Sequence, residues 1–359
     1  MVKPEEGNGL NGPDIENVAA DSAPPSAPAS GANSARSSEA TLLQYLGQHL
    51  GLHQISHHLH QFNNSEVNSA PFIGRLGWNG IASVKRNSTN AELLREVPDA
   101  APLMPLKAML SPRPFLSLAL WKAALMEGMG TFMLVWVTIY SNSSPNVLPE
   151  APTARWGTFN NAAFLGPLIG GILNFMFLTL FTFCFGGVSG AHLNPTITIA
   201  TLFARLCSLP RAILYVAFQT AGGAAGGMMA RAAIGTRDFK VGGCFLYPEI
   251  VPVSDAFAVE FMSCIVLLFF AFGVGLDPRQ KQIVGPTLGP FLIGMTLGSL
   301  SFGTGFARYG YGGASLNPAR CFGTYVGTRF PTFHWIHWYV LLMCDVCVCV
   351  CVCVCRGRS

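Results

Sequence analysis

Long apolar runs separated by short polar links occupy the chain from residue 115 onward. A helix needs about 20 predominantly apolar residues to cross a bilayer. The pattern predicts six membrane-spanning helices, at Phe115–Tyr140, Ala162–Phe185, Leu209–Ile234, Asp255–Leu276, Gly285–Gly303 and from Phe333 onward. The predicted fold class is therefore an all-α membrane protein.

Two shorter apolar runs differ from the others, because each follows a small-residue loop and starts with Asn-Pro. They extend from Asn194 to Arg205 and from Asn317 to about Val326, too short to cross a bilayer. An Asn can cap a helix, and a Pro suits the first helical position. A half-helix that starts inside a membrane exposes unpaired N–H groups and a positive dipole end there. Such backbone is tolerated only where protein or water covers it, so the pattern predicts a polar path near the midplane. The predicted pore centre consists of Asn194, Pro195, Thr196, Asn317, Pro318 and Ala319.

The two halves of this region repeat one plan of three spans and one half-helix. An odd number of spans makes the halves insert with opposite orientation, so the half-helices are expected to meet end to end as inverted repeats. Arg205 and Arg211 flank the link between the second and third spans, and Arg279 and Lys281 lie between the fourth and fifth. Basic links are typical of the cytoplasmic side, and the same orientation places the N-terminus in the cytoplasm.

The first 114 residues are predicted to be a largely disordered cytoplasmic tail. Residues 1–40 are rich in Ser, Ala, Pro, Gly and Asn, and 63–114 are interrupted by many Pro. Residues 41–62 can form an amphipathic helix with a stripe of four His at positions 49, 53, 57 and 60. The stripe is interpreted as a polar face; the alternative is a metal- or proton-sensing stripe.

Composition supports a membrane protein and argues against several other classes. Half of the residues are hydrophobic (50%), only 11% are charged, and the mean hydropathy is +0.41. The net charge of +4 comes from scattered basic residues, which gives no indication of a nucleic-acid partner. No nucleophile–base pair or phosphate-binding loop is evident, so we expect no catalytic residue, no cofactor and no bound metal. Five isolated cysteines are predicted to be small buried hydrophobic residues: Cys184, Cys207, Cys244, Cys264 and Cys321.

The last residues break the membrane-helix pattern. From Cys347 to Cys355, Cys alternates strictly with Val, a period of two that is not typical of a helix. Residues 344–359 are interpreted as an aberrant low-complexity end, from repetitive DNA or a misread exon, that replaces the native end of the sixth span. A metal-binding tail is the alternative, although alternating Cys would lie along one strand face rather than in a zinc tetrahedron. Asn142-Ser-Ser144 forms an acceptor-like glycosylation sequon, weakened by the following Pro.

Ser189-Gly-Ala-His-Leu-Asn-Pro-Thr196 and Leu316-Asn-Pro-Ala-Arg320 resemble the paired Asn-Pro-Ala boxes of the aquaporins, the major intrinsic proteins. The first box departs from the family pattern, with Thr196 in place of Ala. Cys321, directly after Asn-Pro-Ala-Arg, resembles the X intrinsic protein subfamily of plants and fungi. The resemblance covers roughly residues 115–339. It implies a multi-pass channel that contacts membrane lipid, forms a homotetramer, and lies in the plasma membrane, with an internal membrane as the alternative.

The resemblance also implies roles for particular residues. Glu127, and Glu260 as its echo in the second half, would hold the box loops in place, and His192 would brace the first loop. The narrowest point would be a filter made by Asn174, Ser301, Ala314 and Arg320; a gap-free count would place Gly305 where we place Ser301. No filter residue other than Arg320 is large, and none is aromatic. The filter is therefore expected to pass small uncharged solutes such as glycerol, urea, boric acid and hydrogen peroxide, as well as water.

Two other functions remain open at this point. One is a truncated, non-conducting subunit that modulates a homologous channel, suggested by the Cys-Val end. The other is a secondary transporter, which would also use broken helices in inverted repeats. A transporter would need a charged or ion-coordinating site, and within the spans only Glu127 and Glu260 are available for one.

Overall fold

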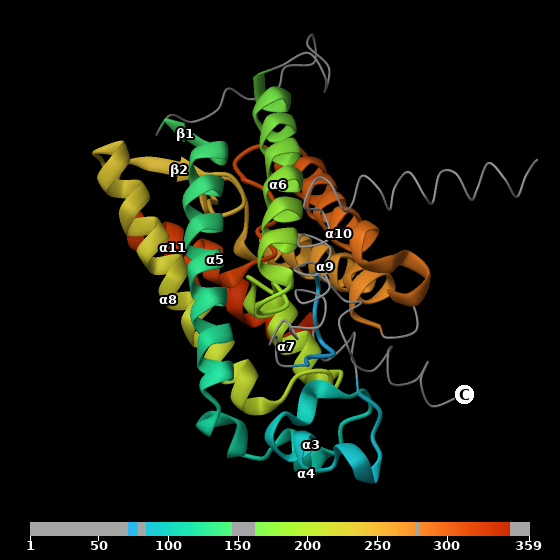
Figure 1. The fold of residues 1–359 in the computed structure, drawn as a ribbon. Coiled ribbons are helices and arrows are strands. Elements are labelled where there is room, and N and C mark those ends of the chain that lie inside the picture. Colours follow the sequence, from blue (N-terminus) through green and yellow to red (C-terminus); the bar gives the residue numbers. More distant parts are fainter. Residues whose placement is uncertain (1–70, 78–83, 146–161, 278–280, 345–359) are drawn as a thin grey trace, which may run out of the picture. The chain divides into compact units, whose positions relative to one another are not determined.

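The computed structural model describes residues 71–77, 84–145, 162–277 and 281–344 (Figure 1). The predicted helix at 41–62 with its His stripe, and the alternating Cys-Val residues, lie outside this part of the chain. Within it, the protein is helical apart from one pair of short strands.

The predicted spans correspond to helices with closely similar bounds. The longer helices are α5 (Leu118–Asn142), α6 (Ala162–Gly186), α8 (Leu209–Ile234), α9 (Val253–Ala271), which continues as the π-helix η4 (Phe272–Leu276), and α10 (Lys281–Gly305). A further helical segment covers 336–344. By length and apolar composition alone, three of the described helices could cross a membrane: Leu118–Asn142, Phe164–Gly186 and Val253–Leu276.

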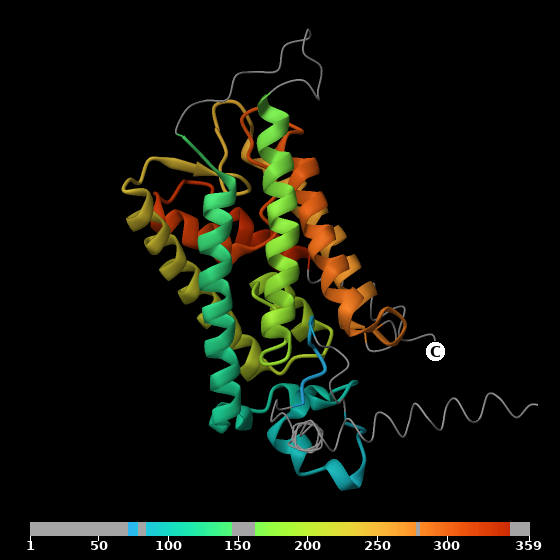
Figure 2. The same ribbon diagram turned by 45° about the horizontal axis from the view of Figure 1, so that its top comes forward.

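The helices pack in pairs, and small residues set how closely they approach. α5 lies along α8, and α6 lies along α10, as both views of the bundle show (Figures 1 and 2). A Cβ added at Gly222 of α8 would lie 2.0 Å from the Gly128 carbonyl oxygen of α5. One added at Gly227 would lie 1.7 Å from the Gly323 carbonyl oxygen. No side chain fits at these crossings, so the glycines allow backbone to rest on backbone.

The two Asn-Pro runs form short helices that start inside the bundle, α7 (Pro195–Phe203) and α11 (Pro318–Gly327). Each begins at a Pro, and each is capped by the preceding Asn. The Asn194 side chain accepts a hydrogen bond from the Thr196 N–H, and the Asn317 side chain accepts one from the Arg320 N–H. The Asn-Pro pattern therefore places both helix starts within one residue of their predicted positions.

One end of the bundle, here the strand end, carries β1 (Ser143–Pro145) paired antiparallel with β2 (Phe239–Val241) (Figure 1). Just beyond β2, Cys244 forms a disulfide with Cys321 of α11. The prediction that these two cysteines are isolated hydrophobic residues is wrong. They are 77 residues apart, and only the fold brings the β2 loop over the start of α11. Cys184 is exposed rather than buried, whereas Cys207 and Cys264 are buried as expected.

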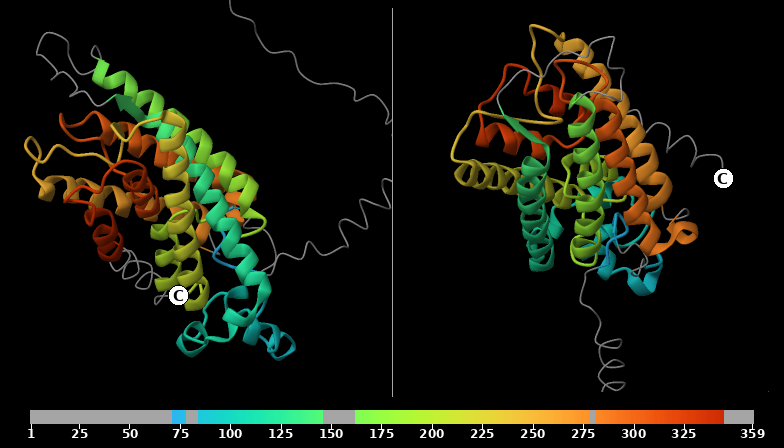
Figure 3. Two further views of the ribbon diagram at one scale, coloured as in Figure 1. Left: turned by 90° about the vertical axis from the view of Figure 1, so that its left-hand side faces the viewer. Right: turned by 90° about the horizontal axis from the view of Figure 1, so that it is seen from above.

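The opposite end, here the tail end, is covered by residues 71–77 and 84–114 (Figure 3). These residues form short helices: η1 (Ser88–Asn90), α3 (Leu93–Glu96), η2 (Pro98–Ala100), α4 (Leu106–Met109) and η3 (Arg113–Leu116). The prediction of low order from residue 63 to 114 is therefore wrong for this part. Pro prevents long helices here but suits first turns: Pro98 begins η2, and Pro105 precedes α4.

A buried polar cluster attaches this region to the bundle. Asp99 is paired with Arg211 of α8, with 2.8 Å between Asp99 Oδ2 and Arg211 Nε, and it also accepts hydrogen bonds from Ser208. Burial alone would raise the pKa of Asp99, but Arg211 and Ser208 together hold it below its ordinary value. Asp99 is therefore ionised at neutral pH, and the pair stays intact there.

Candidate functional site

The starts of α7 and α11 meet at the centre of the bundle and are bonded to each other. Asn194 Nδ2 donates to the Leu316 carbonyl oxygen at 2.8 Å, and Asn317 Nδ2 donates to the Leu193 carbonyl oxygen at 2.9 Å. Leu193 and Leu316 both have positive φ, of 50° and 62°. Non-glycine residues rarely adopt this conformation, and it persists only where the surrounding structure enforces it.

Glu127 of α5 holds the first loop, with its positive-φ Leu193, in this conformation. Its Oε2 accepts hydrogen bonds from the Leu193 N–H at 2.6 Å and from Gln219 Nε2 at 2.9 Å. Its Oε1 accepts from the His192 N–H at 3.1 Å and from Ser189 Oγ at 2.5 Å. The buried carboxylate is thus surrounded by donors, which leaves it occupied with holding the loop.

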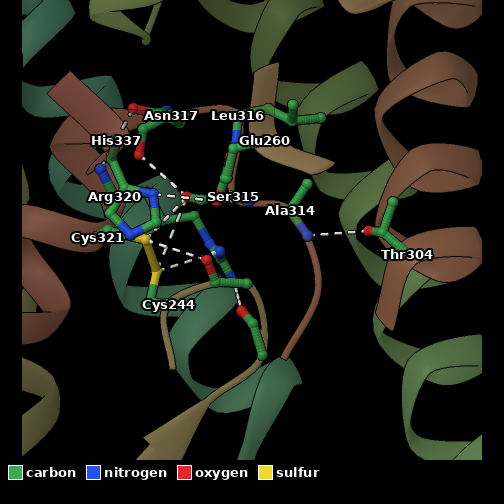
Figure 4. A network of polar contacts seen from close by, with 12 residues as sticks. Cys244, Glu260, Thr304, Ala314, Ser315, Leu316, Asn317, Arg320, Cys321 and His337 are labelled. Atoms are coloured by element: carbon green, nitrogen blue, oxygen red, sulfur yellow. Dashed lines mark hydrogen bonds and ion pairs between the residues drawn. A yellow bond between two sulfur atoms is a disulfide. The ribbon is translucent and has the colours of Figure 1, made fainter. Parts of the chain in front are cut away.

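Glu260 of α9 does the same for the second loop (Figure 4). Ser315 N–H donates to its Oε1 at 2.8 Å, and Leu316 N–H donates to its Oε2 at 3.3 Å. His337 Nδ1 lies 3.0 Å from Oε1, and His337 Nε2 lies 2.8 Å from the Tyr325 hydroxyl. The helical segment 336–344, which contains His337, is thereby connected to the loop of the second box.

Two cavities adjoin the starts of the paired half-helices. The first, of about 280 Å³, is at the strand end; the four predicted filter residues all line it. The second, of about 40 Å³, is at the centre and has room for roughly three or four water molecules, at about 10–15 Å³ of such volume each. Asn194 and Asn317 line this central cavity, together with Leu134, Leu178, Ile197, Leu267, Ile293 and Leu297.

Three predicted filter residues line both cavities: Asn174, Ser301 and Arg320. They therefore stand at the boundary between the two spaces. Ala314 lines only the strand-end cavity, and so does Gly305, the alternative to Ser301. Of the two candidates on α10, only Ser301 reaches both cavities.

The Arg320 guanidinium is held in a fixed orientation (Figure 4). Its Nη2 donates to the Gly242 carbonyl oxygen at 2.7 Å, and its Nε donates to Thr138 Oγ1 at 3.3 Å. Gly243 makes room for it, because a Cβ there would lie 2.6 Å from Arg320 Nη1. The disulfide joins this loop to the residue after Arg320, so the loop and the charge are positioned together.

Asn142 is a residue of the site that the sequence did not indicate. Its Nδ2 donates to Asn174 Oδ1 at 3.1 Å and to the Thr138 carbonyl oxygen at 2.9 Å, and it lines the strand-end cavity. Its own carbonyl oxygen accepts from the Gly242 N–H at 2.9 Å. The side chain is engaged inside the bundle, which disfavours its use as a glycan acceptor. A tripeptide pattern cannot show this, because the partners lie on other elements.

Replacing Asn142 with alanine should change selectivity through Asn174. Without the hydrogen bond, the Asn174 amide can turn and present either group to the path. We expect the ratio of glycerol to water permeability to shift roughly fivefold, equivalent to about 1 kcal/mol for one hydrogen bond. Proteoliposome uptake measures it. Ser141→Ala is the control, since Ser141 lines the same cavity but donates to the Val137 carbonyl oxygen. Equal ratios for Asn142→Ala and the parent would contradict the role.

The geometry of the described residues does not indicate a metal site. Within the described ranges, no group of three or more His, Cys, Asp or Glu side chains is placed to hold a metal ion. His192, next to the first box, is buried, and its ring contacts Thr198 Oγ1 at 3.1 Å and the Gly74 carbonyl oxygen at 2.7 Å. It braces the loop, and it also joins that loop to the tail end.

Comparisons with known proteins point to one family. The family model described as Major intrinsic protein matches residues 115–343. The chain is 29% identical over 223 residues to Aquaporin-2 of Saccharomyces cerevisiae, covering 60% of this chain and 70% of that protein. It is 31% identical over 206 residues to Probable aquaporin TIP4-1 of Oryza sativa subsp. japonica, covering 57% and 77%. It is 30% identical over 228 residues to the Lens fiber major intrinsic protein of Lithobates pipiens, covering 62% and 77%. Among solved structures, an aquaglyceroporin from Plasmodium falciparum aligns with a TM-score of 0.47 and 18% identity, covering 64% of this chain and 93% of that one.

Proposed function

The chain belongs to the major intrinsic protein family, and on that premise we propose that it is a passive, non-ionic pore for small uncharged solutes as well as water. Membership itself makes it a membrane channel for water or small solutes and not an enzyme, as the sequence predicts.

The observation that carries the proposal is the boundary between the two cavities. Asn174, Ser301 and Arg320 meet there, and none of them is aromatic. A hydroxylated solute that leaves bulk water needs replacement hydrogen bonds. An amide, a hydroxyl and a guanidinium can supply them, while the small size of Ser301 and Ala314 leaves room for a carbon chain. Glycerol, urea, boric acid and hydrogen peroxide fit this description.

Exclusion of cations follows from the charges along the same path. Arg320 is the single Arg, Lys, Asp or Glu among the described residues that line the central cavity. The starts of α7 and α11 add two positive dipole ends at the centre. This distribution disfavours a cation-coupled transporter, because Glu127 and Glu260 are already engaged by the box loops.

Orientation and assembly complete the proposal. The tail end carries Arg205 and many other basic residues, so we place it, with the N-terminus, in the cytoplasm. We place the channel in the plasma membrane as a homotetramer. An exposed apolar groove along α8, lined by residues such as Ile213 and Val216 and by Phe322 of α11, supports contact with lipid or a second subunit. Cys321 after the second box supports a position near the X intrinsic proteins.

An aromatic side chain at Ser301 should block the larger solutes first. We expect Ser301→Phe to lower the ratio of glycerol to water permeability about tenfold or more, because the ring fills the boundary that glycerol must pass. The measurement is stopped-flow swelling and glycerol uptake in proteoliposomes, with current recording in expressing cells.

Gly305→Phe is the matched variant for this test, because Gly305 lines only the strand-end cavity. If it changes the ratio and Ser301→Phe does not, the alternative filter position is correct. A parent chain that passes water alone would refute the solute proposal, and large resting cation currents would refute a non-ionic pore. A parent chain that stays silent, together with every variant, would favour a non-conducting subunit.

A further inference from the structure

A short segment of the N-terminal region enters the channel from the cytoplasmic end. Leu76 is only 1% exposed, and it lines the central cavity together with Asn194, Ile197 and Ile293. Its neighbour Ile73 is equally buried within the same apolar cluster. A residue from far outside the six spans therefore forms part of the wall of the pore.

The backbone of this segment is bonded to the first box loop. Leu76 N–H and Gly77 N–H both donate to the Gly190 carbonyl oxygen, at 2.8 and 3.2 Å. The Gly74 carbonyl oxygen lies 2.7 Å from His192 Nε2. Two polar groups of this loop, the Gly190 carbonyl and the His192 ring, are thus occupied by the segment.

Arg75 secures the segment on its other side. Its Nη1 donates to the Gly186 carbonyl oxygen at 2.7 Å and to that of Gly187 at 2.9 Å. Gly186 is the last residue of α6 and Gly187 follows it, so the guanidinium lies at the end of the helix where the dipole favours a cation. Arg75 is 2% exposed, so this contact is shielded from water.

Phe72 and Ile73 connect the segment to the buried pair of Asp99 and Arg211. The Arg211 guanidinium carbon lies 4.1 Å from the centre of the Phe72 ring, and the ring also packs against His192, with 5.6 Å between the ring centres. Ile73 N–H donates to the Asp99 carbonyl oxygen at 2.9 Å. The segment is therefore bound by contacts with α6, α8, the first box loop and η2.

We propose that the cytoplasmic mouth of the channel is a binding site for the chain's own segment Phe72–Gly77, and that Leu76 closes the solute path when the segment is bound. The inference rests on the proposed channel function. An apolar side chain at a narrow point prevents passage by removing water from it. The bound segment also occupies the carbonyl and imidazole groups that a permeating solute would use at that depth.

The bonding pattern suits reversible binding. The polar contacts that hold the segment are hydrogen bonds to backbone carbonyls and the His192 ring, which water can replace after release, whereas the burial of Phe72, Ile73 and Leu76 favours the bound state. Release would therefore leave these groups hydrated rather than unpaired. The buried ion pair of Asp99 in η2 and Arg211 in α8 does not depend on residues 72–77, so it can persist when the segment detaches.

Water permeability of the full chain in proteoliposomes tests the proposal. We expect Leu76→Ala to raise it about fivefold or more over the parent, and Arg75→Ala to raise it as well by loosening the segment. Leu103→Ala is the control, because Leu103 belongs to the same region but is 73% exposed. Equal, substantial permeability of the parent, Leu76→Ala and Arg75→Ala would overturn the proposal.

A second measurement keeps the test independent of activity. In Leu76→Cys, the bound segment should protect the new thiol from a water-soluble maleimide applied to the cytoplasmic side, compared with Leu103→Cys. Labelling of both at one rate would overturn the proposal. If every protein is silent while Leu76→Cys is protected, the segment binds as proposed and the channel function is the part that fails.

Discussion

Glu127→Ala is expected to abolish folding of the channel to a functional state. Removal of the carboxylate leaves the His192 and Leu193 N–H groups without their acceptor, together with Ser189 Oγ and Gln219 Nε2. Each buried unpaired donor costs about 1–3 kcal/mol, so the total is on the order of 5 kcal/mol, comparable with the whole stability of many domains. Surface expression and the thermal midpoint of the purified protein measure the effect.

Glu127→Gln refines this prediction. One of its two terminal atoms becomes an NH₂ donor, which must then face donors such as the Leu193 N–H and Gln219 Nε2. We expect this variant to be destabilised as well, but less than Glu127→Ala. Glu96→Ala is the control, since Glu96 is an exposed carboxylate in the tail region. A thermal midpoint for Glu127→Ala equal to that of the parent would show that the first box loop keeps its conformation without the carboxylate.

Gly227→Ala should disrupt the crossing of α8 and α11. The new Cβ would lie 1.7 Å from the Gly323 carbonyl oxygen, and a backbone atom cannot rotate away as a side chain can. Overpacking of this kind costs about 1–3 kcal/mol or more. Because α11 carries the second box, we expect a lower thermal midpoint and reduced permeability together.

Gly303→Ala is the matched control for that variant. Gly303 lies in α10, is exposed, and has no atom within 4 Å of an added Cβ. Alanine is the better helix former by about 1 kcal/mol, so this variant should be neutral or slightly stabilised. Equal decreases of the thermal midpoint and the permeability in Gly227→Ala and Gly303→Ala would mean that the close crossing of α8 and α11 does not limit stability.

The sequence was sufficient to predict the elements that depend only on neighbouring residues. Asn194 and Asn317 each precede a Pro at a small-residue loop, and the caps they form involve residues two and three positions away. The spans follow from apolar runs, whose ends can be located without knowing which other segments they contact. The placement of Asn174 and Ser301 came from the resemblance, which left Gly305 as the alternative to Ser301; the cavities favour Ser301, because it lines both of them and Gly305 lines one.

The sequence failed where distant segments determine the outcome. Nothing near Cys244 indicates Cys321, because the pair depends on how the β2 loop returns over α11. The segment around Leu76 lies in a Pro-rich, polar region that resembles disorder by composition. It is ordered because the bundle supplies a ready-made apolar site and carbonyl acceptors at Gly186 and Gly190. Composition describes a segment alone and cannot include the site that receives it.

The reciprocal bonds at the pore centre also have a consequence for how the protein is made. Asn194 and Leu316 are 122 residues apart, and Asn317 and Leu193 are 124 apart. A ribosome adds about 5–20 residues each second, so the first box waits roughly 6–25 seconds for its counterpart. During that interval the first half of the pore is a polar, unfinished structure within the insertion machinery or the bilayer. Translation speed between these positions therefore sets how long each nascent chain is exposed to quality control.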